Sequence, residues 1–126
     1  MSVAHLLIGG KAVAGAGEPI AVENPYTTET VATVASASPE QLDAAVAAAR
    51  EAFESWSRTP ALERGEMLHE VARRLRESGE ELARTMTSEG GKPLIENRDE
   101  IEWCAAAFDY YAEIGRDSAG RVIPPI

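Results

Sequence analysis

The sequence predicts a mixed fold in which two β-hairpins precede about four α-helices. Three observations support this prediction. Gly9-Gly10 separates two short apolar runs, Asn24-Pro25 lies between two β-branched segments, and from Ser38 onward apolar residues recur every three or four positions. Glycine pairs and Asn-Pro favour tight turns, whereas the three- and four-residue spacing is typical of amphipathic helices.

The first hairpin is expected over residues 5–13, where LLI and KAV flank Gly9-Gly10. Both glycines accept the positive φ angles that tight hairpin turns require. The second hairpin is expected to pair residues 19–23 with residues 30–35 through a loop at 24–29. Its strands are rich in β-branched residues, which favour extended backbone.

The first long helix is expected to begin at Ser38. Ser38, Pro39 and Gln41 combine an N-cap, a proline at the first helical position and the spacing of a capping box. An apolar stripe then follows one face for about four turns. It consists of Leu42, Ala45, Val46, Ala49, Phe53 and Trp56. Thr59-Pro60 is expected to end this helix and to cap the next one.

Two shorter helices are expected to follow. The residues of the second helix that we expect to face inward are Met67, Leu68, Val71, Ala72 and Leu75. Ser78-Gly79 closes this helix, and a short third helix with Leu82 and Met86 stops at Gly90-Gly91.

The last helix is expected to start near Pro93 and to run to about Gly115. Its expected apolar face consists of Ile101, Cys104, Ala105, Phe108, Tyr111 and Ala112. Residues 121–126 look extended, and an apolar strand at this position needs a partner strand.

The stretch SEGGKPLIE, residues 88–96, raises the question of a phosphate site. Glycine-rich loops that bind phosphate place a lysine and then a Ser or Thr at a helix start. Here Pro93 follows Lys92, and no glycine stands five residues before Gly91. We therefore interpret Gly90-Gly91 as a helix stop and Pro93 as the first turn of the next helix.

Composition excludes several classes of function. With 21 Asp and Glu against 12 Lys and Arg, the formal net charge of -9 repels nucleic acid and anionic lipid. A single cysteine and two scattered histidines exclude an internal disulfide and a zinc-ligand cluster. No stretch approaches the length of a membrane span, and we expect a cytoplasmic protein. Because alanine buries little area, we expect the large apolar side chains to form the core.

Two residues could in principle do chemistry. Cys104 is the sole thiol, and a reactive thiol needs a helix N-terminus or a nearby cation. Its place inside the last helix, near Ile101 and Phe108, favours a small buried core residue instead. His69 has acidic neighbours, and we interpret it as a helix-surface histidine rather than a general base. The residues alone therefore show no active site.

Five segments, taken in order, carry a resemblance to a known family. They are LLIGGKAV, VENPYTTETVATV, SPEQLDAAVAAAREAFESW, GGKPLIE and FDYYA. Their order and spacing closely resemble the N-terminal segment of the aldehyde dehydrogenase superfamily over nearly the whole chain. The resemblance implies part of an α/β fold, with two hairpins and about four helices but without the parallel Rossmann-type sheet. It also implies that residues 1–120 belong to the cofactor-binding domain and that residues 121–126 begin an oligomerisation-arm strand.

Members of this family are NAD(P)-dependent oxidoreductases that convert aldehydes to carboxylates. The resemblance implies that a cysteine thiolate attacks the carbonyl, hydride passes to nicotinamide, and a glutamate-activated water hydrolyses the thioester. The family's nucleophile, catalytic glutamate and principal cofactor-binding residues match sequence beyond Ile126, and Cys104 does not match the nucleophile. We therefore expect no catalytic or cofactor-binding residue here, with NAD or NADP bound by the complete enzyme.

Some roles in the family fall on positions of this chain. Many members hold a structural Na⁺ or K⁺ through backbone oxygens before the NP turn and an acidic side chain before GKP, which here are Val22, Glu23 and Glu89. The alternative is that Glu89 is a solvated residue at a helix end. Thr28 departs from the family's usual glycine, and a positive φ there would strain a β-branched residue.

In similar enzymes the last helix flanks the substrate entrance, which makes Ile101 and Trp103 candidate entrance residues, with packing as the alternative for Trp103. The leading hypothesis is the N-terminal portion of an NAD(P)-dependent aldehyde dehydrogenase that is not catalytic alone. Its expected partners are the remainder of the enzyme, further copies in a homo-oligomer, and an aldehyde substrate. The alternative is a stand-alone helical protein-interaction module or a subunit completed by another chain. Because the family's helices pack on a sheet from later sequence, their apolar stripes should be exposed here.

Overall fold

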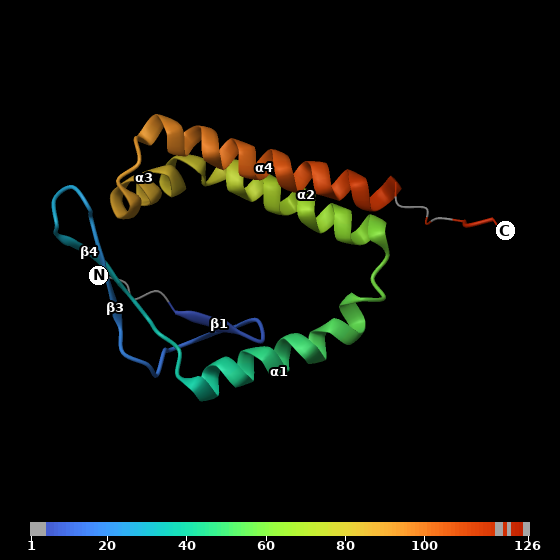
Figure 1. The fold of residues 1–126 in the computed structure, drawn as a ribbon, viewed down its shortest axis with the longest axis horizontal. Coiled ribbons are helices and arrows are strands. Elements are labelled where there is room, and N and C mark those ends of the chain that lie inside the picture. The colour runs from blue at the N-terminus through green and yellow to red at the C-terminus, as the bar shows by residue number, and fades with distance from the viewer. Residues whose placement is uncertain (1–4, 118–119, 121, 125–126) are drawn as a thin grey trace. The chain divides into compact units, whose positions relative to one another are not determined.

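The computed structural model describes residues 5–117, 120 and 122–124. Four short strands, β1 to β4, precede four helices, α1 to α4, within these residues, which confirms the predicted order (Figure 1). The contacts divide the chain into two units. One unit contains Met1–Arg58 and Arg84–Pro93, and the other contains Thr59–Ala83 and Leu94–Ile126.

Both predicted hairpins are present. β1 (Leu6–Ile8) pairs antiparallel with β2 (Lys11–Val13), and β3 (Ile20–Glu23) pairs antiparallel with β4 (Thr30–Val34). At the tip of the first hairpin, the φ angles of the glycine pair are 57° and 75°. Both central residues of a type I′ turn need such positive φ values, which glycine adopts without steric strain.

Helix α1 (Pro39–Trp56) begins at the predicted capping box. Ser38 Oγ accepts a hydrogen bond from Gln41 N at 3.3 Å, and Gln41 Oε1 accepts one from Ser38 N at 3.1 Å. Gln41 also donates from Nε2 to the carbonyl of Ala14 at 2.8 Å and accepts from Ala16 N at 2.9 Å. One side chain therefore caps α1 and holds the segment that follows β2.

Alanines of α1 face the first hairpin. The hollow between them is lined by Leu7, Ile8, Gly9, Gly10, Ala45, Ala48, Ala49 and Ala52. A Cβ atom placed on Gly9 would lie 3.6 Å from Ala48 Cβ, so the hairpin backbone approaches the helix closely. None of the residues of α1, all of which the structure describes, is buried.

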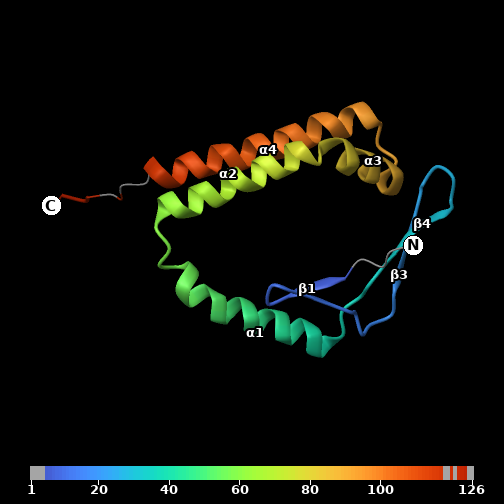
Figure 2. The same ribbon diagram turned by 180° about the vertical axis from the view of Figure 1, so that it is seen from behind.

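In the second unit, α2 (Ala61–Glu77) and α4 (Leu94–Asp117) pack antiparallel along each other, as Figure 1 and the view from behind in Figure 2 both show. The buried contact between them consists largely of small residues. These are Gly65, Ala72, Ala105 and Ala112. A Cβ atom on Gly65 would lie only 3.2 Å from the carbonyl oxygen of Ala112. The two helix backbones therefore approach too closely for large side chains to fit between them.

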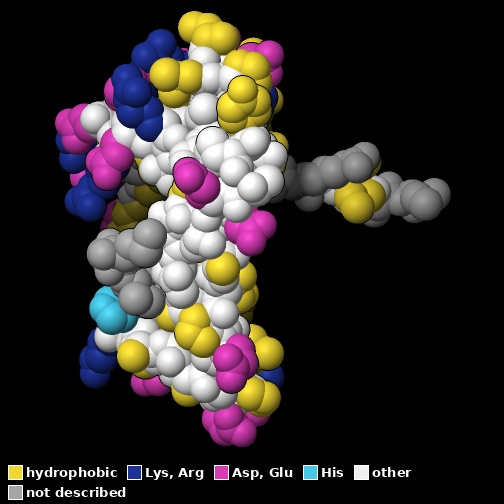
Figure 3. All heavy atoms as spheres, turned by 90° about the vertical axis from the view of Figure 1, so that its left-hand side faces the viewer, with side chains coloured by type: hydrophobic (Ala, Val, Ile, Leu, Met, Phe, Trp, Pro, Cys, Tyr) yellow, Lys and Arg dark blue, Asp and Glu magenta, His cyan; other side chains and the backbone are white. Residues whose placement is uncertain are grey.

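The expectation that large apolar side chains form the core is wrong for the described residues. The buried hydrophobic residues are Ala72, Ala83, Ile101, Ala105 and Ala112, joined by the polar Asn97. The large apolar residues that stay exposed on α1, α2 and α4 include Leu42, Val46, Phe53, Trp56, Leu62, Met67, Val71, Ile95, Trp103, Tyr110, Tyr111 and Ile114. Figure 3 shows hydrophobic side chains at the surface among charged ones. The predicted exposure of the apolar stripes is therefore confirmed for α1 and correct only in part for α2 and α4, where Ala72, Ile101, Ala105 and Ala112 are buried.

The inward face predicted for α2 is correct in part. Ala72 is buried, Leu68 and Leu75 are half-buried, and Met67 and Val71 are exposed. The predicted stripe combined two neighbouring sides of the helix, because a 3.6-residue period does not show which side meets the partner helix.

Helix ends follow the glycines closely. α3 (Gly79–Gly90) stops at the glycine pair, where Gly91 has φ 74° and donates its N–H to the carbonyl of Thr87 at 3.0 Å. The predicted cap at Thr59 is wrong, since Pro60 occupies the N-cap of α2 and no side chain caps it. The strand predicted over residues 121–126 lies partly outside the described residues. Its described part, residues 122–124, is exposed and forms no strand.

Candidate functional site

Two sequence motifs, Asn24-Pro25 and GGKP, meet in the first unit. Asn24 Oδ1 accepts hydrogen bonds from the N–H groups of Tyr26 at 2.9 Å and Thr27 at 3.1 Å, which closes the turn after β3. A Cβ atom on Gly91 would lie 2.7 Å from Pro25 Cγ, a distance that no side chain could tolerate unless the proline moved. Positive φ and lack of space therefore both require glycine at position 91.

The candidate cation ligands flank these motifs. Val22 and Glu23 lie at a β-bulge directly before the turn, and Glu89 is exposed near the end of α3. A bulge disrupts the regular ladder of strand hydrogen bonds, and backbone carbonyls together with a carboxylate suit a hard cation. The contact of Gly91 with Pro25 brings the end of α3 to the turn. Cation binding by Val22, Glu23 and Glu89 stays a prediction.

The two candidate entrance residues point to different sides of α4. Ile101 is 8% exposed and packs toward Gly79, whereas Trp103 is 72% exposed. Residues two apart on an α-helix differ in direction by about 200°. The structure therefore does not bring these side chains together, and their role at an entrance stays a prediction.

Cys104 is exposed, which corrects the expectation of a buried core residue. The contact of α4 with its neighbours passes through Ile101, Ala105 and Ala112, and position 104 lies beside this seam. Cys104 also lies well inside α4, which begins at Leu94, and not at a helix N-terminus, where reactive thiols are often placed. This setting supports the interpretation that Cys104 is not a nucleophile.

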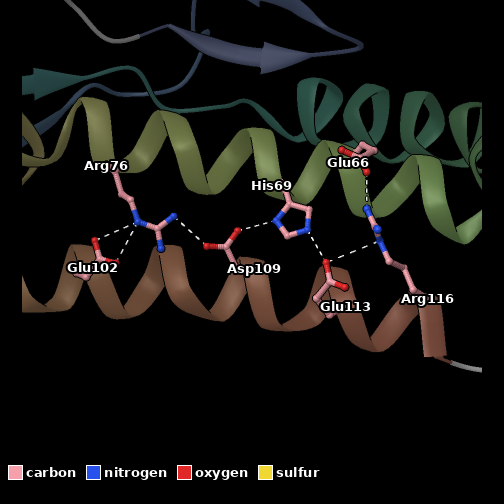
Figure 4. A network of polar contacts seen from close by, with 7 residues as sticks. All are labelled: Glu66, His69, Arg76, Glu102, Asp109, Glu113 and Arg116. Carbon is pink, nitrogen blue, oxygen red and sulfur yellow. Dashed lines mark hydrogen bonds and ion pairs between the residues drawn. The ribbon is translucent and has the colours of Figure 1, made fainter.

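A network of charged side chains joins α2 to α4 (Figure 4). His69 of α2 lies between two carboxylates of α4, with Nδ1 2.7 Å from Asp109 Oδ1 and Nε2 2.8 Å from Glu113 Oε1. Its side chain is 32% exposed, in keeping with a position at the helix surface. Sequence reasoning did not predict these partners. Asp109 and Glu113, four residues apart on α4, indicate a face that could bind a basic side chain. The sequence of neither helix alone shows which residue of α2 lies opposite that face.

The hydrogen bonds shift the ionisation of this network. The bond to Asp109, followed by the bond to Glu113, raises the pKa of His69 above its ordinary value of 6.5. In turn, His69 and then Arg76 lower the pKa of Asp109 below 3.8. Both shifts favour the charged forms, so the arrangement is an ionic contact. An imidazolium bonded on both nitrogens has no lone pair with which to act as a base.

Arginines extend the network along the two helices. Arg76 Nε lies 3.0 Å from Glu102 Oε1, and Arg76 Nη1 lies 2.9 Å from Asp109 Oδ2. Arg116 of α4 pairs with Glu66 of α2. These pairs are exposed, and each contributes little alone, but together they fix the antiparallel register of α2 and α4.

In the part of the chain that the structure describes, no group of three or more His, Cys, Asp or Glu is arranged to hold a metal ion. None of the described helices combines the length and hydrophobicity needed to cross a membrane.

Comparison with known proteins gives a consistent result. The model of the aldehyde dehydrogenase family matches residues 12–125. A mitochondrial succinate-semialdehyde dehydrogenase of Oryza sativa subsp. japonica is 40% identical over 120 residues, which cover 94% of this chain and 23% of the relative. A 4-(hydroxymethyl)benzenesulfonate dehydrogenase of Comamonas testosteroni is 41% identical over 121 residues, which cover 95% of this chain and 25% of the relative.

Solved structures agree in fold. A variant of an aldehyde dehydrogenase from Bacillus cereus matches with a TM-score of 0.92 and 32% identity, over 99% of this chain and 26% of that one. Betaine aldehyde dehydrogenase from Staphylococcus aureus, solved in complex with NAD⁺, matches with a TM-score of 0.89 and 32% identity over 98% of this chain and 26% of that enzyme. An NADP-dependent enzyme of E. coli matches with a TM-score of 0.91 and 33% identity, also over 98% of this chain and 26% of that enzyme.

The chain spans about a quarter of the length of the curated relatives it matches. The second hairpin, the NP turn, the glycine stop and the paired helices all lie in the region that the family model matches. The chain therefore belongs to the aldehyde dehydrogenase family.

Proposed function

We propose that the chain forms the N-terminal part of an NAD(P)-dependent aldehyde dehydrogenase, which oxidises an aldehyde to a carboxylate, and that these 126 residues are not catalytic alone. The distribution of apolar side chains carries this proposal. Most buried hydrophobic residues are alanines, whereas large side chains such as Phe53 (65% exposed) and Trp103 (72% exposed) stay at the surface. Apolar surface of this kind normally marks an interface with further protein.

The relatives support the reaction and the cofactor. The matched enzymes are dehydrogenases, and the structures include one solved with NAD⁺ and one described as NADP-dependent. The nucleophile, catalytic glutamate and principal cofactor contacts would then come from sequence outside this chain. Its partners would be that remainder of the enzyme or further copies of the chain, in the cytoplasm.

Assay of the purified chain tests the catalytic part of the proposal. We expect no formation of NADH or NADPH with a panel of aldehydes. Activity should appear when the chain is co-expressed with the segment that follows the matched region in its relatives. Turnover by the chain alone that is abolished in Cys104→Ala, while Cys104→Ala retains the melting temperature, would overturn the proposal.

We further propose that the carbonyl oxygens of Val22 and Glu23 and the carboxylate of Glu89 hold Na⁺ or K⁺. The melting temperature of the chain in potassium or sodium chloride should then be higher than in choline chloride at equal ionic strength. Glu89→Gln should remove this difference, whereas Glu51→Gln, on the exposed surface of α1, should retain it. Equal melting temperatures in all three salts would count against the site.

A further inference from the structure

The geometry around His69 places one carboxylate oxygen opposite each ring nitrogen, at 2.7 Å and 2.8 Å. Only the imidazolium form carries an N–H on both nitrogens. A neutral ring can donate to Asp109 or to Glu113 but not to both, and its lone pair would then face the other carboxylate within hydrogen-bond distance. The arrangement is therefore complementary to one protonation state.

We propose that His69 is an ionic clasp that makes the packing of α2 on α4 depend on pH. The clasp is closed while the imidazole is protonated, because it then bridges Asp109 and Glu113. It opens when the imidazole loses its proton, because one hydrogen bond is lost and a lone pair meets a carboxylate.

The surrounding charges make His69 the member of this network that titrates near neutral pH. The charged groups that lie around it on the two helices are Glu66, Glu70, Arg73 and Arg76 from α2, and Glu102, Asp109, Glu113 and Arg116 from α4. Histidine is the side chain whose unperturbed pKa lies closest to neutral pH, so protonation of His69 is the charge change expected in this network near neutral pH.

The directions of the shifts define a pH window. The pKa of His69 is raised in the folded chain, so its contribution to stability is fully present below the unfolded value and is lost as pH rises through the folded value. The pKa of Asp109 is lowered, so its contribution is present above the unfolded value and is lost as pH falls through the folded value. The clasp therefore stabilises most at mildly acidic pH, above the unfolded pKa of Asp109 and below the unfolded pKa of His69.

Titration of the ring by NMR tests the clasp directly. A sample with ¹³C-labelled histidine should give ring signals from His5 and His69, and the His5→Gln variant identifies the signal of His69. We expect the apparent pKa of His69 to be higher in the folded chain than in concentrated urea. It should also fall in Glu113→Gln, which removes one charged acceptor. An apparent pKa in the folded chain equal to or below that in urea would overturn the proposal.

Thermal melts provide a second readout. We expect His69→Gln to lower the melting temperature near pH 6, and the difference from the wild type to shrink toward about pH 9 because the wild-type ring loses its proton as pH rises through its folded pKa. His5→Gln should show no such trend. A difference that stays constant from pH 6 to 9 would mean that His69 acts through packing alone and would contradict the clasp.

Discussion

At the scale of single residues, Thr28 carries a backbone strain that the turn imposes on it. Its φ of 62° makes it the one non-glycine residue with positive φ among those the structure describes. Thr28 therefore adopts the left-handed conformation despite its β-branched side chain. Hydrogen bonds from Thr28 N to the carbonyl of Asn24, and from Asn24 N to the carbonyl of Glu29, hold the loop closed around it.

Replacing Thr28 by glycine should stabilise the chain. The left-handed conformation costs an L-residue about 1–2 kcal/mol, part of which is offset by the greater freedom of glycine in the unfolded state. We expect a net gain of about 0.5–1 kcal/mol in the free energy of unfolding, measured by urea denaturation. Thr33→Gly, at a regular pair of β4 with Ala21, is the matched control and should destabilise. Loss of stability in both variants would show that Thr28 is not strained.

Gln41 does more than its position in a capping box requires. A capping box accepts either Glu or Gln at this position, but here Gln41 Nε2 also donates to the carbonyl of Ala14. Gln41→Glu should therefore lower stability by about 1–2 kcal/mol at neutral pH, because a carboxylate would face a carbonyl oxygen. The loss relative to wild type should shrink below about pH 4, where the protonated carboxyl can donate again. A loss that does not change with pH would contradict this reading of the contact.

At the scale of secondary-structure elements, the pairing of α2 with α4 depends on small side chains. Ala72 and Ala105 are 0% exposed, and Gly65 approaches the backbone of Ala112. The alanines therefore act as spacers that set how closely the helices approach. Large apolar residues such as Met67 and Trp103 stay exposed instead.

Ala72→Leu should separate the helices. Overpacking a close contact costs about 1–3 kcal/mol, so we expect a lower melting temperature by circular dichroism. Ala106→Leu, at an exposed position of α4, adds the same atoms outside the contact and should change stability by no more than about 0.5 kcal/mol. Equal effects of the two variants would show that the seam is not tightly packed.

At the scale of the whole molecule, large apolar side chains of α1, α2 and α4 stay exposed, among them Phe53 at 65% and Trp103 at 72%. Such a surface is expected to bind other apolar surfaces.

The purified chain should therefore bind a hydrophobic dye or self-associate. Phe53→Lys on α1 should reduce dye binding while changing the free energy of unfolding by no more than about 0.5 kcal/mol, since Phe53 is 65% exposed. Ala48→Lys, beside the first hairpin, is a control that should disturb folding instead. A monomer that melts cooperatively and binds no dye would favour the stand-alone interaction module over part of an enzyme.

Local signals in the sequence predicted the elements well. Gly9-Gly10, the Ser38 capping box and Gly90-Gly91 each act within a few residues, so their outcome does not depend on distant partners. The same reasoning failed at Cys104 and Met67. An apolar period shows that a helix has an apolar face, but it does not show whether this chain covers that face.

The sequence by itself determined the order of hairpins and helices, most of their starts and stops, and the family, because turns, caps and motif order are local properties of the chain. The tertiary structure decided that alanines rather than large apolar residues form the buried contacts, and that His69 meets Asp109 and Glu113. Both outcomes depend on the distance and register between helices, which arise only when two elements pack.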